Sequence, residues 1–142
     1  IAEEHGRDNM FATLFIAVLT PDSGELVYLN AGHEAPLLRR TDGRLESIEP
    51  AGLAVGVMSG QRPATGRCTL APGDVLLGFT DGVTESVGDG GAFGEDRTRA
   101  LLEPSPSSAA ELVARVDDAV RAHAGRHPPH DDLTVLVLRR RP

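Results

Sequence analysis

Two short acidic motifs could carry chemistry in this chain, and each adjoins an apolar run. Asp81, within Thr80-Asp81-Gly82, follows the apolar run 75–79, and Asp131-Asp132 lead into the apolar run 133–138. If the two runs form antiparallel neighbouring strands, Asp81 and Asp131 meet at one edge of the sheet. Clustered carboxylates repel one another and lose hydration, and a hard cation relieves both costs. Oxygen ligands of this kind suit Mg²⁺ or Mn²⁺ better than zinc, and Gly82 permits the tight turn that aims Asp81.

Each motif taken alone also has a purely structural interpretation. Thr-Asp-Gly is a common turn, and Asp-Asp commonly precedes a strand. The histidines His123, His127 and His130 surround Pro128-Pro129 and suggest a metal cluster, but no cysteine or second histidine pair completes a zinc set. A solvated loop is therefore the favoured interpretation of these histidines.

The elements that would position the acidic motifs are mostly strands, with helices late in the chain. Alternating or apolar runs bounded by turn residues predict strands, and the turns 20–24, 42–43 and 71–73 predict that successive strands pair. The predicted strands are 10–19 (buried), 25–30, 35–41, 44–48, 65–70, 74–80 and 133–138 (central), with 65–70 and 74–80 as one pair. A short helix is predicted over 95–103. A longer one follows the capping box of Ser108 and Glu111 and ends near Gly125.

Length and composition narrow the protein class. A chain of 142 residues with 40% hydrophobic and 25% charged residues fits a single globular domain over 1–142. The net charge of -7 argues against a nucleic-acid binder, which needs a basic face. No stretch approaches the roughly 20 apolar residues of a membrane span, and the single cysteine, Cys68, indicates a reduced, cytoplasmic setting.

Taken together and in order, the motifs resemble the stage II sporulation protein E branch of the PPM (protein phosphatase 2C-like) serine/threonine phosphatases. The resemblance covers about 10–140 with motif order and spacing kept. Its motifs are Met10-Phe-Ala-Thr-Leu-Phe15, Tyr28-Leu-Asn-Ala-Gly-His33, Leu70-Ala-Pro-Gly-Asp-Val-Leu-Leu77, Phe79-Thr-Asp-Gly-Val-Thr-Glu85, Phe93-Gly-Glu95 and Asp131-Asp-Leu-Thr-Val135.

The resemblance implies an α+β fold, an α-β-β-α sandwich, that holds two Mn²⁺ or Mg²⁺ ions. Water at the two metals attacks the phosphorus of phosphoserine or phosphothreonine directly. Asp81 and Asp131 match the family's metal-ligating aspartates, and Asp132 and Gly82 would support them. His33 either lies near the phosphoprotein or packs a turn after a strand, and Glu85 fits the pattern without an assignable chemical role.

The departure from the family concerns the segment that carries its other ligands. No Gly-Asp-x-x-Gly motif opens this chain, and Asp8 and Glu3-Glu4 stand in a different context. We therefore expect a partial domain, missing the N-terminal strands and helices, and two carboxylates cannot by themselves hold two octahedral metals. The isolated fragment is expected to be inactive, and its uncovered strands predict a homodimer or larger assembly.

Two functions remain open at this point. One is a phosphoprotein phosphatase acting, by the family's habit, on the phosphoserine of an anti-sigma-factor antagonist. The other is a non-enzymatic pseudophosphatase that binds the partner protein without hydrolysis. Asp81 and Asp131 favour the enzyme, and the missing upstream ligands keep the regulator open.

Overall fold

The structure is a computed structural model that describes residues 10–58, 60, 64–128 and 131–141. Its described residues group into two compact units. The first combines Ile1–Ala35 with Ile48–Leu70, and the second combines Pro36–Ser47 with Ala71–Pro142. Each unit is built around one antiparallel sheet.

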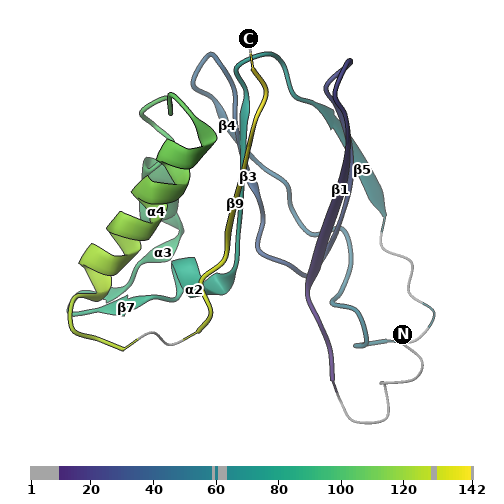
Figure 1. Cartoon of the computed structure of the whole chain (residues 1–142). Helices are drawn as coiled ribbons and strands as arrows, with labels where there is room; N and C mark the ends of the chain where they lie inside the picture. Colours follow the sequence, from purple (N-terminus) through teal and green to yellow (C-terminus); the bar gives the residue numbers. More distant parts are fainter. Residues whose placement is uncertain (1–9, 59, 61–63, 129–130, 142) are drawn as a thin grey trace. The chain divides into compact units, whose positions relative to one another are not determined.

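The sheet of the first unit has three strands in the order β1-β2-β5. Figure 1 labels the two outer strands, β1 and β5. They are β1 (Leu14–Thr20), β2 (Glu25–Ala31) and β5 (Thr65–Thr69). The predicted hairpin of the first two strands is confirmed, and its turn closes with a bond from Gly24 N to Thr20 O of 2.8 Å. The prediction that the first strand is buried is wrong: Ile16 and Val18 are 51% and 65% exposed. Among the described residues β1 pairs only with β2, and the side chains of the strand are left largely uncovered.

The sheet of the second unit has the order β4-β3-β6-β9. Its strands are β3 (Leu37–Arg39), β4 (Leu45–Ser47), β6 (Val75–Phe79) and β9 (Val135–Arg139). The predicted hairpin at Asp42-Gly43 is confirmed by the pairing of β3 with β4.

Two strand predictions are corrected by this topology. The runs 65–70 and 74–80 were expected to pair with each other, but β5 pairs with β2 and β6 pairs with β3 and β9. The turn at 71–73 thus carries the chain from one sheet into the other. The final strand was expected to be central, whereas β9 pairs only with β6 among the described residues and leaves Leu136 59% exposed.

A buried carboxylate fixes the turn that leads into β6. Asp74 is fully buried and accepts hydrogen bonds from the backbone N–H groups of Thr41 (3.0 Å) and Ala71 (2.9 Å). It also pairs with the Arg40 guanidinium at 2.9 Å. Arg40 in turn holds Glu46 and, through that hydrogen bond, keeps the pKa of Glu46 below its usual range. These bonds satisfy a charge that would otherwise be costly to bury.

Helices and one small hairpin complete the second unit. The helices are α2 (Asp81–Thr84), α3 (Gly94–Ala100) and α4 (Ala109–Ala124), and the hairpin joins β7 (Val87–Gly88) to β8 (Gly91–Ala92). The short α2 and the hairpin were not predicted. Helix α4 begins as predicted, with Ser108 Oγ accepting from Glu111 N at 3.1 Å. The return bond differs from a capping box, because the Glu111 carboxylate accepts from the backbone N–H and hydroxyl of Ser107.

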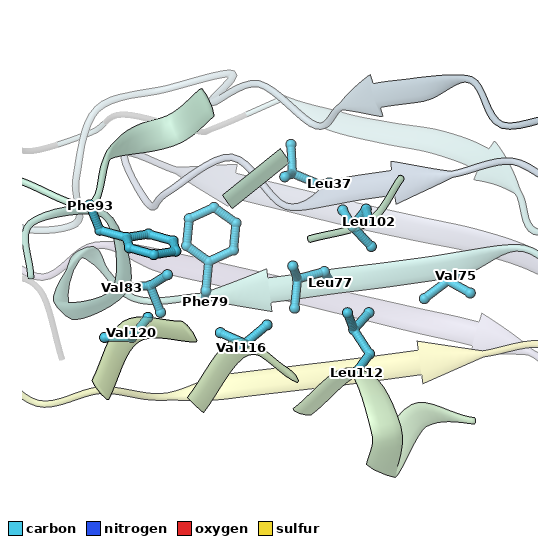
Figure 2. Packing of buried hydrophobic residues seen from close by; sticks show 10 residues of the cluster. All are labelled: Leu37, Val75, Leu77, Phe79, Val83, Phe93, Leu102, Leu112, Val116 and Val120. Atoms are coloured by element: carbon cyan, nitrogen blue, oxygen red, sulfur yellow. The ribbon is translucent and has the colours of Figure 1, made fainter. Parts of the chain in front are cut away.

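The core of the second unit lies between its helices and one face of its sheet. Val75, Leu77 and Phe79 alternate along β6 and share that face, where they meet the buried stripe of α4 (Figure 2). The ten clustered side chains are those of Leu37, Val75, Leu77, Phe79, Val83, Phe93, Leu102, Leu112, Val116 and Val120. The mixture of antiparallel sheets and helices confirms the α+β class. None of the helices in the described part of the chain combines the length and apolarity needed to cross a bilayer.

Candidate metal centre

Thr80 joins the end of β6 to the segment that leads into β9. The two strands are antiparallel neighbours, as predicted, with Phe79 opposite Val135. Beyond that pair, Thr80 N donates to Thr134 O at 3.1 Å. The Thr80 hydroxyl donates to Asp132 O at 2.9 Å and accepts from Thr134 N at 3.0 Å. Three hydrogen bonds therefore hold the Thr-Asp-Gly turn beside the Asp-Asp segment.

Thr80 is a positioning residue that the sequence motif did not disclose. It occupies the N-cap position of α2, where threonine usually accepts a bond from the first helical turn. Here its side chain makes no such bond and reaches across to the neighbouring segment instead. A hydroxyl between two strand ends gave no separate sequence signal, because threonine before Asp-Gly also fits an ordinary turn.

Gly82 brings the two backbones into direct contact. A Cβ at this position would lie 2.5 Å from Asp132 O and 3.3 Å from Leu133 Cα. Any side chain would therefore displace the Asp-Asp segment. The sequence assigned Gly82 to a tight turn, and the structure adds that close approach is its main requirement.

The carboxylates of Asp81 and Asp131 lie at the same end of the paired strands and are both exposed. Asp81 opens α2, and no hydrogen bond or ion pair within the described residues engages its carboxylate. Asp131 Oδ1 accepts from Asp132 N at 2.7 Å, which orients its side chain, and Asp132 is itself exposed. Both candidate ligands thus keep carboxylate oxygens available to a cation.

A cavity of about 440 Å³ adjoins this edge of the sheet. We call it the α4 cavity. The residues that line it and matter here are Gly82, Glu85, Val120, Ala124, Asp131 and Leu133. One candidate ligand and the backbone beside the other therefore open onto the same hollow.

His33 belongs to the first unit and is held there by Asn30. Its backbone N–H donates to Asn30 Oδ1 at 2.9 Å, and its ring Nδ1 lies 3.1 Å from Thr13 Oγ1. The buried Asn30 also donates to Ile48 O at 3.1 Å. The sequence motif gives Asn30 no role of its own, yet its side chain organises the turn that presents His33. A role of His33 at the metals stays a prediction.

The late histidines contact the small hairpin. His127 Nε2 lies 2.9 Å from Asp89 Oδ1, and His123 Nε2 lies 2.8 Å from Gly91 O. His130 lies outside the described residues. These contacts join the end of α4 to the β7–β8 turn and give no sign of a histidine metal cluster in the described part of the chain.

The donor chemistry at the paired strand ends fits part of a divalent-cation site. Asp81 and Asp131 offer hard oxygen donors, and no cationic side chain among the described residues pairs with them, which suits Mg²⁺ or Mn²⁺. Across 10–58, 60, 64–128 and 131–141, however, no three histidine, cysteine, aspartate or glutamate side chains come close enough together to hold a metal ion. The described residues therefore supply a share of such a site and no complete one.

Comparison with known sequences gives one family over almost the whole chain. The pattern of the family described as stage II sporulation protein E (SpoIIE) matches residues 1–141. The chain is 33% identical over 141 residues to Protein IcfG of Synechocystis sp.. It is 30% identical over 143 residues to the phosphoserine phosphatase RsbU of Bacillus subtilis. In both cases the match covers 99% of this chain, but it covers only 22% of IcfG and 42% of RsbU.

Solved structures show the same fold. The Mn-presoaked phosphatase domain of SpoIIE from Bacillus subtilis superposes with a TM-score of 0.72 at 17% identity, covering 92% of this chain and 57% of that one. The RsbU and RsbW domains of Rv1364c from Mycobacterium tuberculosis give 0.66 at 27% identity, covering 91% and 37%. The α+β fold of a PP2C-type phosphatase domain is thus confirmed, and with the family match over 1–141 the chain belongs to the SpoIIE family.

Proposed function

We propose that this chain is part of a metal-dependent protein phosphatase that hydrolyses phosphoserine or phosphothreonine on a regulatory protein. The observation that carries the proposal is the juxtaposition of Asp81 and Asp131 at one end of β6 and β9, in a chain of the SpoIIE family. RsbU, a relative at 30% identity, is a phosphoserine phosphatase. Since the chain covers less than half of RsbU, the activity of the whole protein is inferred.

Asp81 and Asp131 would hold Mn²⁺ or Mg²⁺ through their carboxylates. Two such ions, when bound, supply an activated water and neutralise charge that develops on the phosphoryl group. Thr80 and Gly82 keep the two carboxylate-bearing segments together, and the Asp132 N–H orients Asp131. We assign Asp132 a supporting role at the site and no direct metal bond.

The substrate we propose is an anti-sigma-factor antagonist carrying phosphoserine, in a cytoplasmic partner-switching system. Support comes from the likeness to RsbU and to a protein in which RsbU and RsbW domains share one chain. A phosphoprotein also fits the exposed position of the two carboxylates, because a folded partner can reach them.

The test compares isosteric substitutions in the full-length protein. Asp81→Asn and Asp131→Asn keep the shape but remove the charge that offsets the metal, so Mn²⁺-dependent hydrolysis of a phosphoserine peptide should fall at least about a hundredfold. Asp118→Asn, at an exposed position of α4, is the matched control and should keep activity. Isothermal titration with Mn²⁺ gives a second readout, in which both test variants should bind more weakly. Full activity and unchanged Mn²⁺ affinity in Asp81→Asn would refute the proposal.

The alternative is a pseudophosphatase that binds the phosphoprotein without hydrolysis. It is kept because the described residues group no three metal-binding side chains. We further propose that residues 1–142 alone turn over poorly for the same reason. Partner binding by the full-length protein without turnover under any Mn²⁺ or Mg²⁺ concentration would favour the alternative, and robust turnover by residues 1–142 would contradict our account of the ligand set.

A further inference from the structure

Glu85 belongs to the Phe79–Glu85 motif but has no role in the proposed metal site. It follows α2, its backbone N–H donates to Asp81 O at 2.7 Å, and its exposed side chain lines the α4 cavity together with Asp131. The apolar part of the lining comes from Val120, Ala124 and Leu133. The cavity thus offers an apolar wall with a carboxylate at one side, next to a candidate metal ligand.

The other charged groups of the cavity already have partners. Arg121 Nε bonds both carboxylate oxygens of Asp117 at 2.8 Å, and His127 pairs with Asp89 at 2.9 Å. Within the described residues, the Glu85 carboxylate has no hydrogen-bond or ion-pair partner. We assign Asp131 to the metal ion. The carboxylate of Glu85 then remains without a partner, so the unpaired charge of the cavity is negative.

This charge pattern selects the kind of occupant. An anion would face Glu85, Asp117 and Asp131, and the two basic side chains of the lining, Arg121 and His127, already pair with Asp117 and Asp89. A bare metal ion finds no group of three ligand side chains in the described part of the chain. A guanidinium or ammonium on an aliphatic stem fits both features, because its stem can lie on apolar walls while its head meets one carboxylate. A volume of about 440 Å³ has room for such a side chain, lying in the ~300–1,000 Å³ range of ligand pockets.

We propose that the α4 cavity is a specificity site that receives an arginine or lysine of the phosphoprotein substrate, close in sequence to the phosphoserine, and that Glu85 is its carboxylate partner. The inference rests on the proposed function, since the adjacency of Asp131 places the phosphoryl group beside the cavity. It gives the substrate class a recognisable chemistry: a basic residue near the phosphorylated serine.

The test measures peptide binding, so it does not depend on turnover. Fluorescein-labelled peptides of Ala, Gly and Gln carry a central phosphonate analogue of phosphoserine, which a phosphatase cannot hydrolyse, and one arginine, placed in turn at each of three positions on either side. Each has a partner peptide with citrulline, which keeps the shape and removes the charge. Fluorescence anisotropy with the full-length protein and Mn²⁺ should show about three- to tenfold tighter binding for arginine at one or two positions, the strength of a partly exposed charged pair.

Substitution then assigns the preference to Glu85. Glu85→Gln should bind the arginine and citrulline peptides equally, whereas Glu103→Gln, at an exposed glutamate away from the cavity, should keep the preference. Circular dichroism and thermal melting establish that both variants fold. Equal binding of the two peptide series by the unsubstituted protein, or a preference that persists in Glu85→Gln, overturns the inference. An arginine preference without hydrolysis would refute the catalytic proposal and leave this one standing.

Discussion

Gly82→Ala tests whether close backbone contact is what assembles the metal centre. The added Cβ would lie 2.5 Å from the carbonyl oxygen of Asp132, and real Cβ atoms essentially never come within 3.0 Å of such an atom. The two segments must therefore separate by at least about 0.5 Å. The obstructing atom belongs to the backbone, so no side chain can rotate away to relieve the contact.

The cost follows from what that separation disturbs. Forced overpacking typically costs about 1–3 kcal/mol. The same Asp132 oxygen accepts the Thr80 hydroxyl at 2.9 Å, and weakening that bond adds about 1 kcal/mol. We expect the free energy of unfolding to fall by about 2–4 kcal/mol. Misplacing ligands by a fraction of an ångström should lower Mn²⁺-dependent phosphatase activity by about tenfold or more.

Gly90→Ala is the matched control. No heavy atom lies within 4 Å of a Cβ at Gly90, and its φ lies outside the left-handed region. This substitution should be neutral or slightly stabilising, because alanine restricts the unfolded chain. Urea denaturation and Mn²⁺-dependent peptide hydrolysis, measured on both variants of the full-length protein, give the comparison. If Gly82→Ala matched Gly90→Ala in both assays, the contact with Asp132 would not be what positions the ligands.

Three further predictions concern stability, pH and association. Asp74→Ala removes one of the two carboxylate partners of Arg40 and the acceptor of the Thr41 and Ala71 N–H groups, and should cost about 3 kcal/mol in urea denaturation. The exposed Asp42→Ala should cost well under half of that, and similar losses would refute the special role of Asp74. Hydrogen bonds from Ser107, and then Arg115, lower the pKa of Glu111 from 4.5 to about 2. The ionised form is thus favoured by folding, and its contribution is present above pH 4.5 and disappears as the pH falls to 2. Glu111→Gln should be less stable at pH 6, and a stability gap that did not shrink between pH 4.5 and 2 would contradict this. Residues 1–142 should self-associate through the apolar face of β1, where Ile16 and Val18 are 51% and 65% exposed. Light scattering should detect dimers, and the double substitution Ile16→Thr with Val18→Thr should weaken them. A monomer at every concentration would count against this prediction.

Local patterns predicted most of the secondary structure. The hairpins at Gly24 and at Asp42-Gly43 formed as expected, because turn residues and alternation act between neighbours in the sequence. Helix α4 begins directly after its N-cap Ser108 for the same reason. The four-residue α2 was beyond a periodicity argument, since one turn is too short to show a repeat.

Non-local pairing explains the errors. A turn at 71–73 between two strand-like runs predicted a hairpin, but Gly73 N bonds to Arg140 O, far along the chain, and β5 and β6 separate into different sheets. An apolar run likewise predicts burial without saying which element provides it. The run 133–138 therefore could not reveal that β9 is an edge strand among the described residues.

The candidate site divides in the same way between what a motif can and cannot reveal. Asp81 and Asp131 were identifiable because charge at the end of an apolar strand is conspicuous, and their strands pair as predicted. Thr80, Asn30 and the orientation of Glu85 were not, because each depends on atoms contributed from elsewhere in the fold.

That division has a physical cause in how the site is held. In the described part of the chain, the carboxylates that would bind the cation are exposed and have few hydrogen-bond partners, which leaves oxygens available to a cation. Their placement instead depends on a hydroxyl and on the absence of a Cβ, both of which act through the backbone. The carboxylates have few internal partners, while the backbone that carries them is held in place. A cation or a basic substrate residue would therefore bind without first displacing internal hydrogen bonds. In our proposal, the unpaired carboxylate of Glu85 would bind the substrate in the same way as the exposed aspartates would bind the metal.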